Sequence, residues 1–221
     1  MTDRRRFIAQ LGAAASAMAL DAEEMRAMER GAERADDGKW DTSWIERVER
    51  AKYRVVFNAS DVSDGAALAY ASTFLDHFRE VHGTNDGDTR AVIVFRRRGT
   101  PMVFGDALWD RYEIGAEANV DDRRAGGKAR RNVFWKPAPG ASPESASSTL
   151  ESLAARGLVS LVCNISIGSW SHGFAERSKR DVEEVRREVL AGLVPGTIVV
   201  PSGIYALIRA QNAGCAYMPG T

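Results

Sequence analysis

Short apolar runs alternate with amphipathic stretches along the chain from Lys52 onward. Runs of four to six mostly apolar residues, bounded by polar or glycine-containing segments, are typical of buried strands. Such runs occur at 53–57, 91–95, 158–163, 197–200 and 215–218. Buried strands that alternate with helices form a mostly parallel sheet covered on both faces. The pattern therefore predicts an α/β domain over 52–221.

The stretches between these runs contain residue types that start or end helices. A Ser-x-x-Glu pattern, Ser43 to Glu46, predicts a capping box for a short helix over 43–50. Further helix starts are expected at Asp61 or Ser63, at Thr100-Pro101, at Ser178 and at Ser202, and Gly157 is expected to end a helix over 148–156. The segment that follows 158–163 is expected to be a loop containing His172.

Two parts of the chain lack this regular alternation. Residues 20–51 are largely charged and alanine-rich, and we expect a helical N-terminal extension whose Trp44, Ile45 and Val48 dock on the domain. Residues 113–146 mix charges, glycines and prolines without a clear period. A long insertion of this kind is a lid, a binding loop or an oligomer contact, or else a disordered excursion. The sequence leaves these alternatives open.

The first 19 residues have the order of an export signal. Arg4, Arg5 and Arg6 precede a mild apolar run from Ala9 to Leu20, which contains an A-x-A pattern at 17–19. Paired arginines before such a run are typical of a twin-arginine signal, which predicts export by that machinery, removal of 1–19 and a periplasmic or otherwise extracytoplasmic location. The alternative is an ordinary amphipathic helix with a basic start.

Composition narrows the class of protein. The 221 residues contain 30 basic and 30 acidic side chains, and this balance argues against a nucleic-acid binder. Two cysteines and three scattered histidines do not supply a disulfide framework or a metal site. No apolar stretch approaches the roughly 18 residues of a membrane-spanning helix.

Candidate chemistry gathers at the predicted carboxyl edge of the sheet, where ligands bind in open parallel sheets. Cys163 ends a buried strand beside helix N-termini, which lower the pKa of a thiol, so it is the candidate catalytic thiolate. The candidate binding residues at the same edge are Asn58, Ser60, Arg96, Arg98, Asn164 and Ser202. Two alternatives stay open for Cys163: a small, inert core residue, or a disulfide with Cys215.

Familiar catalytic and nucleotide-binding motifs are absent. The segment 168–173 misses the G-x-S-x-G spacing, because Trp170 stands where the serine would be. No P-loop and no G-x-G-x-x-G follows the first strand. The sequence implies no particular cofactor.

An ordered set of segments resembles the DsrE/DsrF-like family, and especially its exported members with a twin-arginine leader. These segments are DALWDRY at 106–112, NVFW at 132–135, LVSLVCN at 158–164, LVPG at 193–196, VPSGI at 200–204 and GCAY at 214–217. The resemblance implies a three-layer α/β/α domain with a five-stranded, mostly parallel sheet, commonly in homo-oligomers. It also implies that Cys163 occupies the position that carries a persulfide in the sulfur-relay members.

The match departs from the family pattern next to the thiol. Many relatives have Cys-Gly-Asn-Thr-Met, whereas this chain has Cys163-Asn164-Ile165-Ser166-Ile167. Two functions follow as hypotheses. The first is a thiol-based sulfur carrier or transferase that uses Cys163, and the second is a non-catalytic extracytoplasmic binding or assembly protein in which Cys163 is buried and inert.

Overall fold

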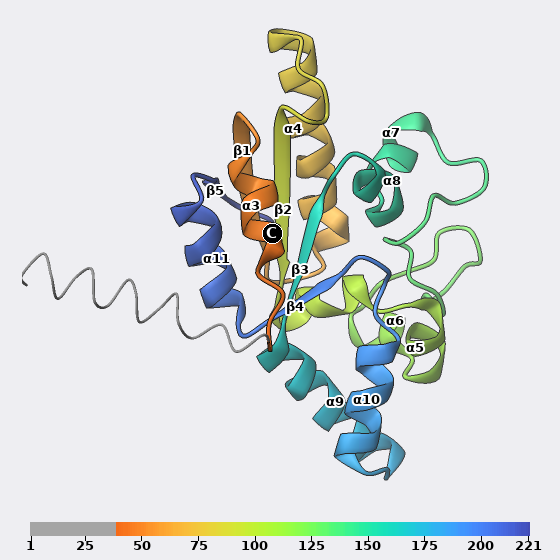
Figure 1. Ribbon diagram of the computed structural model, residues 1–221. Helices are drawn as coiled ribbons and strands as arrows, with labels where there is room; N and C mark the ends of the chain where they lie inside the picture. Colours follow the sequence, from red (N-terminus) through yellow and green to blue (C-terminus); the bar gives the residue numbers. More distant parts are fainter. Residues whose placement is uncertain (1–38) are drawn as a thin grey trace, which may run out of the picture. The chain divides into compact units, whose positions relative to one another are not determined.

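A single five-stranded sheet forms the centre of the computed structural model, which describes residues 39–221 (Figure 1). Its strands are β1 (Tyr53–Ala59), β2 (Thr89–Phe95), β3 (Val159–Cys163), β4 (Ile198–Val200) and β5 (Ala216–Pro219). They lie in the order β4-β3-β2-β1-β5, and every neighbouring pair is parallel. Each predicted strand is confirmed, and no strand end differs from its predicted position by more than two residues.

Helices cover both faces of this sheet. On the first face are α4 (Ala66–His82), α5 (Asp106–Arg111), α8 (Leu150–Ala155), α9 (Asn164–Ser178) and α10 (Val182–Ala191). On the second face are α3 (Ser43–Glu49) and α11 (Gly203–Asn212). Strand residues alternate between the two layers: Phe57 and Ile93 pack toward α4, whereas Val56 packs toward α3 and α11. The three-layer α/β/α fold is confirmed.

Several predicted helix boundaries agree with the structure. The Ser202 hydroxyl caps α11 by accepting a hydrogen bond from the Tyr205 N–H at 3.0 Å. Gly157 adopts a left-handed φ of 86° just after α8, as expected for a residue that ends a helix. Trp44 and Val48 of α3 are fully buried against the second face, as predicted.

Other predicted caps are wrong, because a neighbouring group makes the contact. Ser43 lies inside α3, and its N–H donates to the Asp41 carboxylate at 2.9 Å, so there is no capping box. Asp181 caps α10 by accepting from the N–H groups of Glu183 and Glu184. The Ser178 hydroxyl instead donates to the Phe174 carbonyl at the end of α9, at 2.7 Å.

The predicted starts at Thr100-Pro101 and at Asp61 or Ser63 are also wrong. The segment at Thr100-Pro101 lies in the 3₁₀ turn η2 (Arg97–Val103), and the segment at Asp61 or Ser63 leads into the 3₁₀ turn η1 (Ser63–Gly65). In both cases the α-helix begins later in the chain. The tight η2 turn brings Gly99 against the end of β1, where a Cβ would lie 2.3 Å from the Ala59 carbonyl oxygen. Only glycine fits this approach of two backbones.

The segment after β3 is the largest departure from the prediction. It is the helix α9 rather than a loop, and it starts at the residue that follows Cys163. Two glycines, Gly168 and Gly173, interrupt its apolar pattern and weaken the helical signal in the sequence. His172 is therefore an exposed helix residue, 3.5 Å from Glu176 on the next turn.

The irregular insertion 113–146 packs on the domain. It contains the short helices α6 (Ile114–Glu117) and α7 (Pro143–Ser147). Asn132 is buried and holds the segment in place, because its side-chain amide donates to the carbonyls of Met102 and Phe104, each at 2.7 Å. Phe134 joins the core of the first face. These contacts favour a packed insertion over a disordered one.

The predicted signal peptide at 1–19 and most of the predicted extension, 20–38, lie outside the described residues. Within 39–221, no helix is both long enough and apolar enough to cross a membrane.

Candidate functional site

The carboxyl ends of β1 to β4 form one edge of the sheet and bring the predicted site residues to the same side. Ala59 pairs with Phe95, and Cys163 pairs with Val200, so these strands end almost level with one another. Asn58, Arg96, Cys163 and Ser202 lie at or just beyond these ends. The edge is therefore the place where the strand ends could present a shared site.

Cys163 lies at the junction between β3 and α9. It is the last residue of the strand and the N-cap of the helix, with φ −70° and ψ 116°, so the chain changes from strand to helix without a loop. Its side chain is buried, at 5% exposed, and the thiol is free. The first turn of α9 therefore begins immediately beside the sulfur atom.

Two helix N-termini meet at this thiol. Burial raises the pKa of Cys163, but hydrogen-bond donors outweigh it and hold the pKa below its ordinary value. The donors are the Ser166 hydroxyl and the backbone N–H groups of Ser166, Gly203 and Ile165. These donors stabilise the charged thiolate more than the neutral thiol, and this difference lowers the pKa.

Ser166 links the thiol to the turn that follows β2. Its hydroxyl oxygen accepts a hydrogen bond from the Arg97 N–H at 2.8 Å. A hydroxyl that accepts through its oxygen keeps its own hydrogen for donation, and here that hydrogen favours the Cys163 thiolate. Arg97 has a left-handed φ of 51°, and its carbonyl accepts from the Trp170 indole N–H at 2.8 Å. Both backbone groups of Arg97 are thus fixed by α9.

Arg96 and Arg98 leave this turn in different directions. The aliphatic part of Arg96 packs on the first residue of α11, because a Cβ at Gly203 would lie 2.8 Å from the Arg96 Cδ. Arg98 forms an ion pair with Asp61 at 3.0 Å. Of the two predicted arginines, Arg96 is the one placed beside the helix N-terminus that faces Cys163.

The other predicted binding residues make contacts within the fold. The Asn58 amide donates to the Tyr217 hydroxyl at 3.1 Å, and its Oδ1 is buried without a partner. The Ser60 N–H donates to the Asn58 carbonyl at 3.1 Å. Asn164 accepts a short hydrogen bond from Arg186 of α10. Ser202 uses its hydroxyl to cap α11.

Cys215 lies beside β5, three strands away from β3 in the sheet. It precedes β5, and β1 and β2 lie between β5 and β3. Three strand spacings amount to about 14 Å, well beyond the roughly 7 Å that a disulfide allows between Cα atoms. Both cysteines are free, which excludes the alternative of a Cys163–Cys215 disulfide. Burial raises the pKa of Cys215 to about 11.

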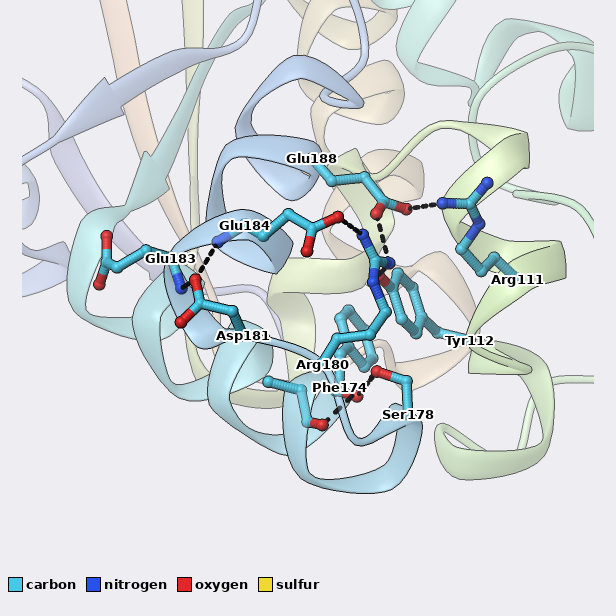
Figure 2. Close-up of polar contacts among 10 residues, drawn as sticks. Arg111, Tyr112, Phe174, Ser178, Arg180, Asp181, Glu183, Glu184 and Glu188 are labelled. Carbon is cyan, nitrogen blue, oxygen red and sulfur yellow. Dashed lines mark hydrogen bonds and ion pairs between the residues drawn. The ribbon is translucent and has the colours of Figure 1, made fainter.

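A polar network holds the far end of α9 in place (Figure 2). Arg180 donates to Glu184 and to Glu188 at 2.7 Å, and to the Tyr112 hydroxyl at 3.0 Å. The Tyr112 ring stacks on Phe174 of α9, with 4.1 Å between centroids. Because this network joins α5, α9 and α10, the helix whose first turn faces Cys163 is fixed at both ends.

The described residues offer little for a metal. No group of three or more histidine, cysteine, aspartate or glutamate side chains within 39–221 could hold a metal ion.

Ser166 and Gly203 are site residues that were not among those predicted from the sequence. A signal for Ser166 exists: it lies three residues after Cys163, where a helix that starts at Asn164 presents its first turn. That signal is useful only once α9 is recognised as a helix. Gly203 could not be found in this way, because its position depends on the pairing of β3 with β4.

Comparison with known proteins adds little. No protein-family model and no curated protein matches the chain. One similar solved structure is described as a protein of unknown function, MTH1491, from Methanobacterium thermoautotrophicum. It has 17% sequence identity and a TM-score of 0.38, over 76% of this chain and 98% of that chain. A likeness this weak says nothing about function.

Proposed function

We propose that this protein is a thiol-based sulfur carrier or transferase of the DsrE/DsrF-like kind, with Cys163 as the sulfur acceptor. The observation that carries the proposal is the convergence of the N-termini of α9 and α11 on one buried thiol. Donors of this kind stabilise a thiolate, and the positive ends of the same helices also favour the terminal anion of a persulfide. The sequence segments that resemble the family support the same reading.

The proposed reaction is a simple exchange at sulfur. The Cys163 thiolate attacks the terminal sulfur of a donor persulfide, R–S–SH. The S–S bond of the donor breaks, the donor leaves as the thiolate R–S⁻, and Cys163 becomes Cys–S–SH. No oxidant is required, because the sulfane sulfur passes unchanged in oxidation state from one thiol to the other.

The cellular setting is part of the proposal. The arginines at 4–6 and the A-x-A pattern at 17–19 support twin-arginine export and an extracytoplasmic location. The family resemblance supports a homo-oligomer.

Mass spectrometry of peptides from the treated full-length protein tests the proposal. After incubation with a low-molecular-weight persulfide such as glutathione persulfide, we expect the Cys163 peptide to gain one sulfur atom, about 32 Da. Cys163→Ala should abolish the gain. Cys215→Ala is the matched control, since it removes the other buried thiol and should leave loading intact. Loading on Cys215, or on neither cysteine, would contradict the proposal.

One observation favours a second candidate function. The Cys163 side chain is only 5% exposed, as expected of an inert core residue in a non-catalytic binding or assembly protein. In that case Cys163→Ala would leave every measurable function of the protein unchanged.

A further inference from the structure

A pocket of about 420 Å³ lies between η2 and α9, next to the surroundings of Cys163. Its lining residues are Arg97, Arg98, Glu117, Ile165, Ser166, Ser169, Trp170 and Gly173. Two of them, Ile165 and Ser166, also supply the donors that lower the pKa of Cys163. The pocket and the thiol thus share the first turn of α9.

Arg97 lines this pocket, and its guanidinium group has no ion-pair partner among residues 39–221. Arg98 is paired with Asp61, and Glu117 is paired with Arg177 at 2.7 Å. Arg97 has no ion pair with any carboxylate within 39–221. Its backbone is nevertheless fixed in the left-handed region by its bonds to Ser166 and Trp170. An arginine with a fixed backbone, whose exposed guanidinium has no carboxylate partner, is suited to receive an anion.

The rest of the lining consists of two serines, Ser166 and Ser169, an apolar part formed by Ile165 and Trp170, and a glycine in mid-helix. Ile165 is 65% exposed, which is unusual for so large an apolar side chain, and Trp170 lies on the same helix. Gly173 costs α9 about 1 kcal/mol of helix stability relative to alanine. A Cβ at Gly173 would meet only the end of the flexible Arg177 side chain, at 3.7 Å. The absent side chain therefore leaves space in the pocket rather than relieving a clash.

We propose that this pocket binds a small organic anion with a flat apolar body, whose anionic group lies at Arg97 and whose body packs on Trp170 and Ile165. This inference rests on the proposed function in one respect: there, the bound anion is the sulfur substrate of Cys163. Binding itself does not require a reactive thiol. The two ideas can therefore fail separately.

The test is a titration with naphthalene-1-sulfonate, followed by NMR of the tryptophan indole N–H signals. We expect the Trp170 signal, assigned with Trp170→Phe, to shift on binding, because that N–H donates to the Arg97 carbonyl. The neutral analogue 1-naphthalenemethanol should bind at least about tenfold more weakly, as expected for the loss of one charge-assisted hydrogen bond. Equal affinity for both probes would overturn the assignment of the anion to Arg97.

Two arginine variants separate a local effect from general charge. Arg97→Gln should weaken naphthalene-1-sulfonate binding about tenfold. Arg123→Gln removes the same charge at a residue outside this pocket and should leave the affinity unchanged. Equal losses in the two variants would show non-specific attraction to a basic surface.

Two glycine variants on α9 test the space itself. Gly173→Leu should abolish binding by filling the pocket, whereas Gly168→Leu, on the same helix but outside the lining, should not. Both replace an interior helix glycine, so both should keep or raise the melting temperature. Unchanged binding in Gly173→Leu would place the ligand elsewhere and overturn the proposal.

Cys163→Ala distinguishes this failure from that of the proposed function. It should bind the probe like the natural chain. If persulfide loading fails while the probe still binds through Arg97, only the sulfur chemistry is overturned. If loading succeeds while the probe ignores Arg97 and Gly173, only the pocket is overturned.

Discussion

The two cysteines have nearly equal exposure, but their pKa values are shifted in opposite directions. Cys163 is 5% exposed and Cys215 is 7% exposed. The pKa of Cys163 is lowered despite burial, whereas burial raises the pKa of Cys215 to about 11. Exposure alone therefore does not determine the direction in which the pKa of a buried thiol is shifted in this fold.

The same helix accounts for part of this difference. The first N–H of α11, at Gly203, favours the Cys163 thiolate. Cys215 follows the other end of α11, and its N–H donates to the Ala210 carbonyl at 3.0 Å. A helix carries partial positive charge at its N-terminus and partial negative charge at its C-terminus. The N-terminus of α11 thus favours a thiolate at the carboxyl edge of the sheet. At the amino edge, burial raises the pKa of Cys215 and outweighs the nearby Arg54, which lowers it.

The largest expected effect is a difference in alkylation rate between the two thiols. With one pKa below 9.0 and the other about 11, the thiolate fractions at neutral pH differ at least about 100-fold. The lower nucleophilicity of the more acidic thiolate offsets about half of this on a logarithmic scale, which leaves at least about tenfold. Iodoacetamide kinetics on Cys215→Ala and Cys163→Ala, each with one thiol, measure the ratio. Equal rates would remove the distinction between the two edges.

The next effect concerns stability, and its sign differs between the two thiols. Because the folded pKa of Cys215 is raised, its contribution to stability is complete below the ordinary pKa near 9.0 and is lost as the pH rises toward about 11. The natural chain should lose about 1–2 kcal/mol over that window relative to Cys215→Ala.

The lowered pKa of Cys163 produces the opposite trend. Its contribution is present above the ordinary pKa and is lost as the pH falls through the folded pKa. Urea unfolding at pH 7.5, 9 and 10.5 under reducing conditions, compared between variants so that other titrations cancel, measures both trends. Parallel curves for the two alanine variants would contradict the difference in surroundings.

The placement of Cys163 could be predicted from the sequence, but its donors could not. Residues 158–163 form a mostly apolar run that ends in cysteine, which predicts a buried strand. The alternation of strands and helices predicts that this strand end lies at the carboxyl edge of a parallel sheet. Gly203 lies 40 positions further along the chain and reaches the thiol only because β4 pairs with β3. That pairing depends on the order of strands in the sheet, which local patterns do not encode.

The helix α9 could not be predicted from the sequence for a different reason. Serine and glycine at helix positions lower the helical signal of the segment after Cys163, so the local sequence resembles a loop. In the structure, packing of Ile167 and Phe174 in the core overcomes this weak propensity. The caps predicted at Ser43 and Ser178 do not form. Asp41 accepts the Ser43 N–H, and Asp181 accepts the N–H groups at the start of α10. The sequence patterns alone did not rank these competing acceptors.

The smallest effect isolates the contribution of Ser166 to the acidity of Cys163. Ser166→Ala removes the hydroxyl that favours the thiolate and the acceptor of the Arg97 N–H. The backbone donors from α9 and α11 remain, so we expect the alkylation rate at neutral pH to fall only about threefold, which corresponds to roughly 0.6 kcal/mol. The control Ser169→Ala removes an exposed hydroxyl of α9, bonded to the Ile165 carbonyl, and should not change the rate.

The full pH–rate profile decides whether Ser166 acts on the thiol or merely supports the helix. A direct effect shifts the profile of Ser166→Ala to higher pH, and Ser166→Thr, which keeps a hydroxyl, restores it. A loss of rate without a shift in pH would mean that access to the thiol had changed instead. The lowered pKa of Cys163 would then be due to the backbone N–H groups at the edge of the sheet, and the contrast with Cys215 would depend on these groups and on the burial of Cys215.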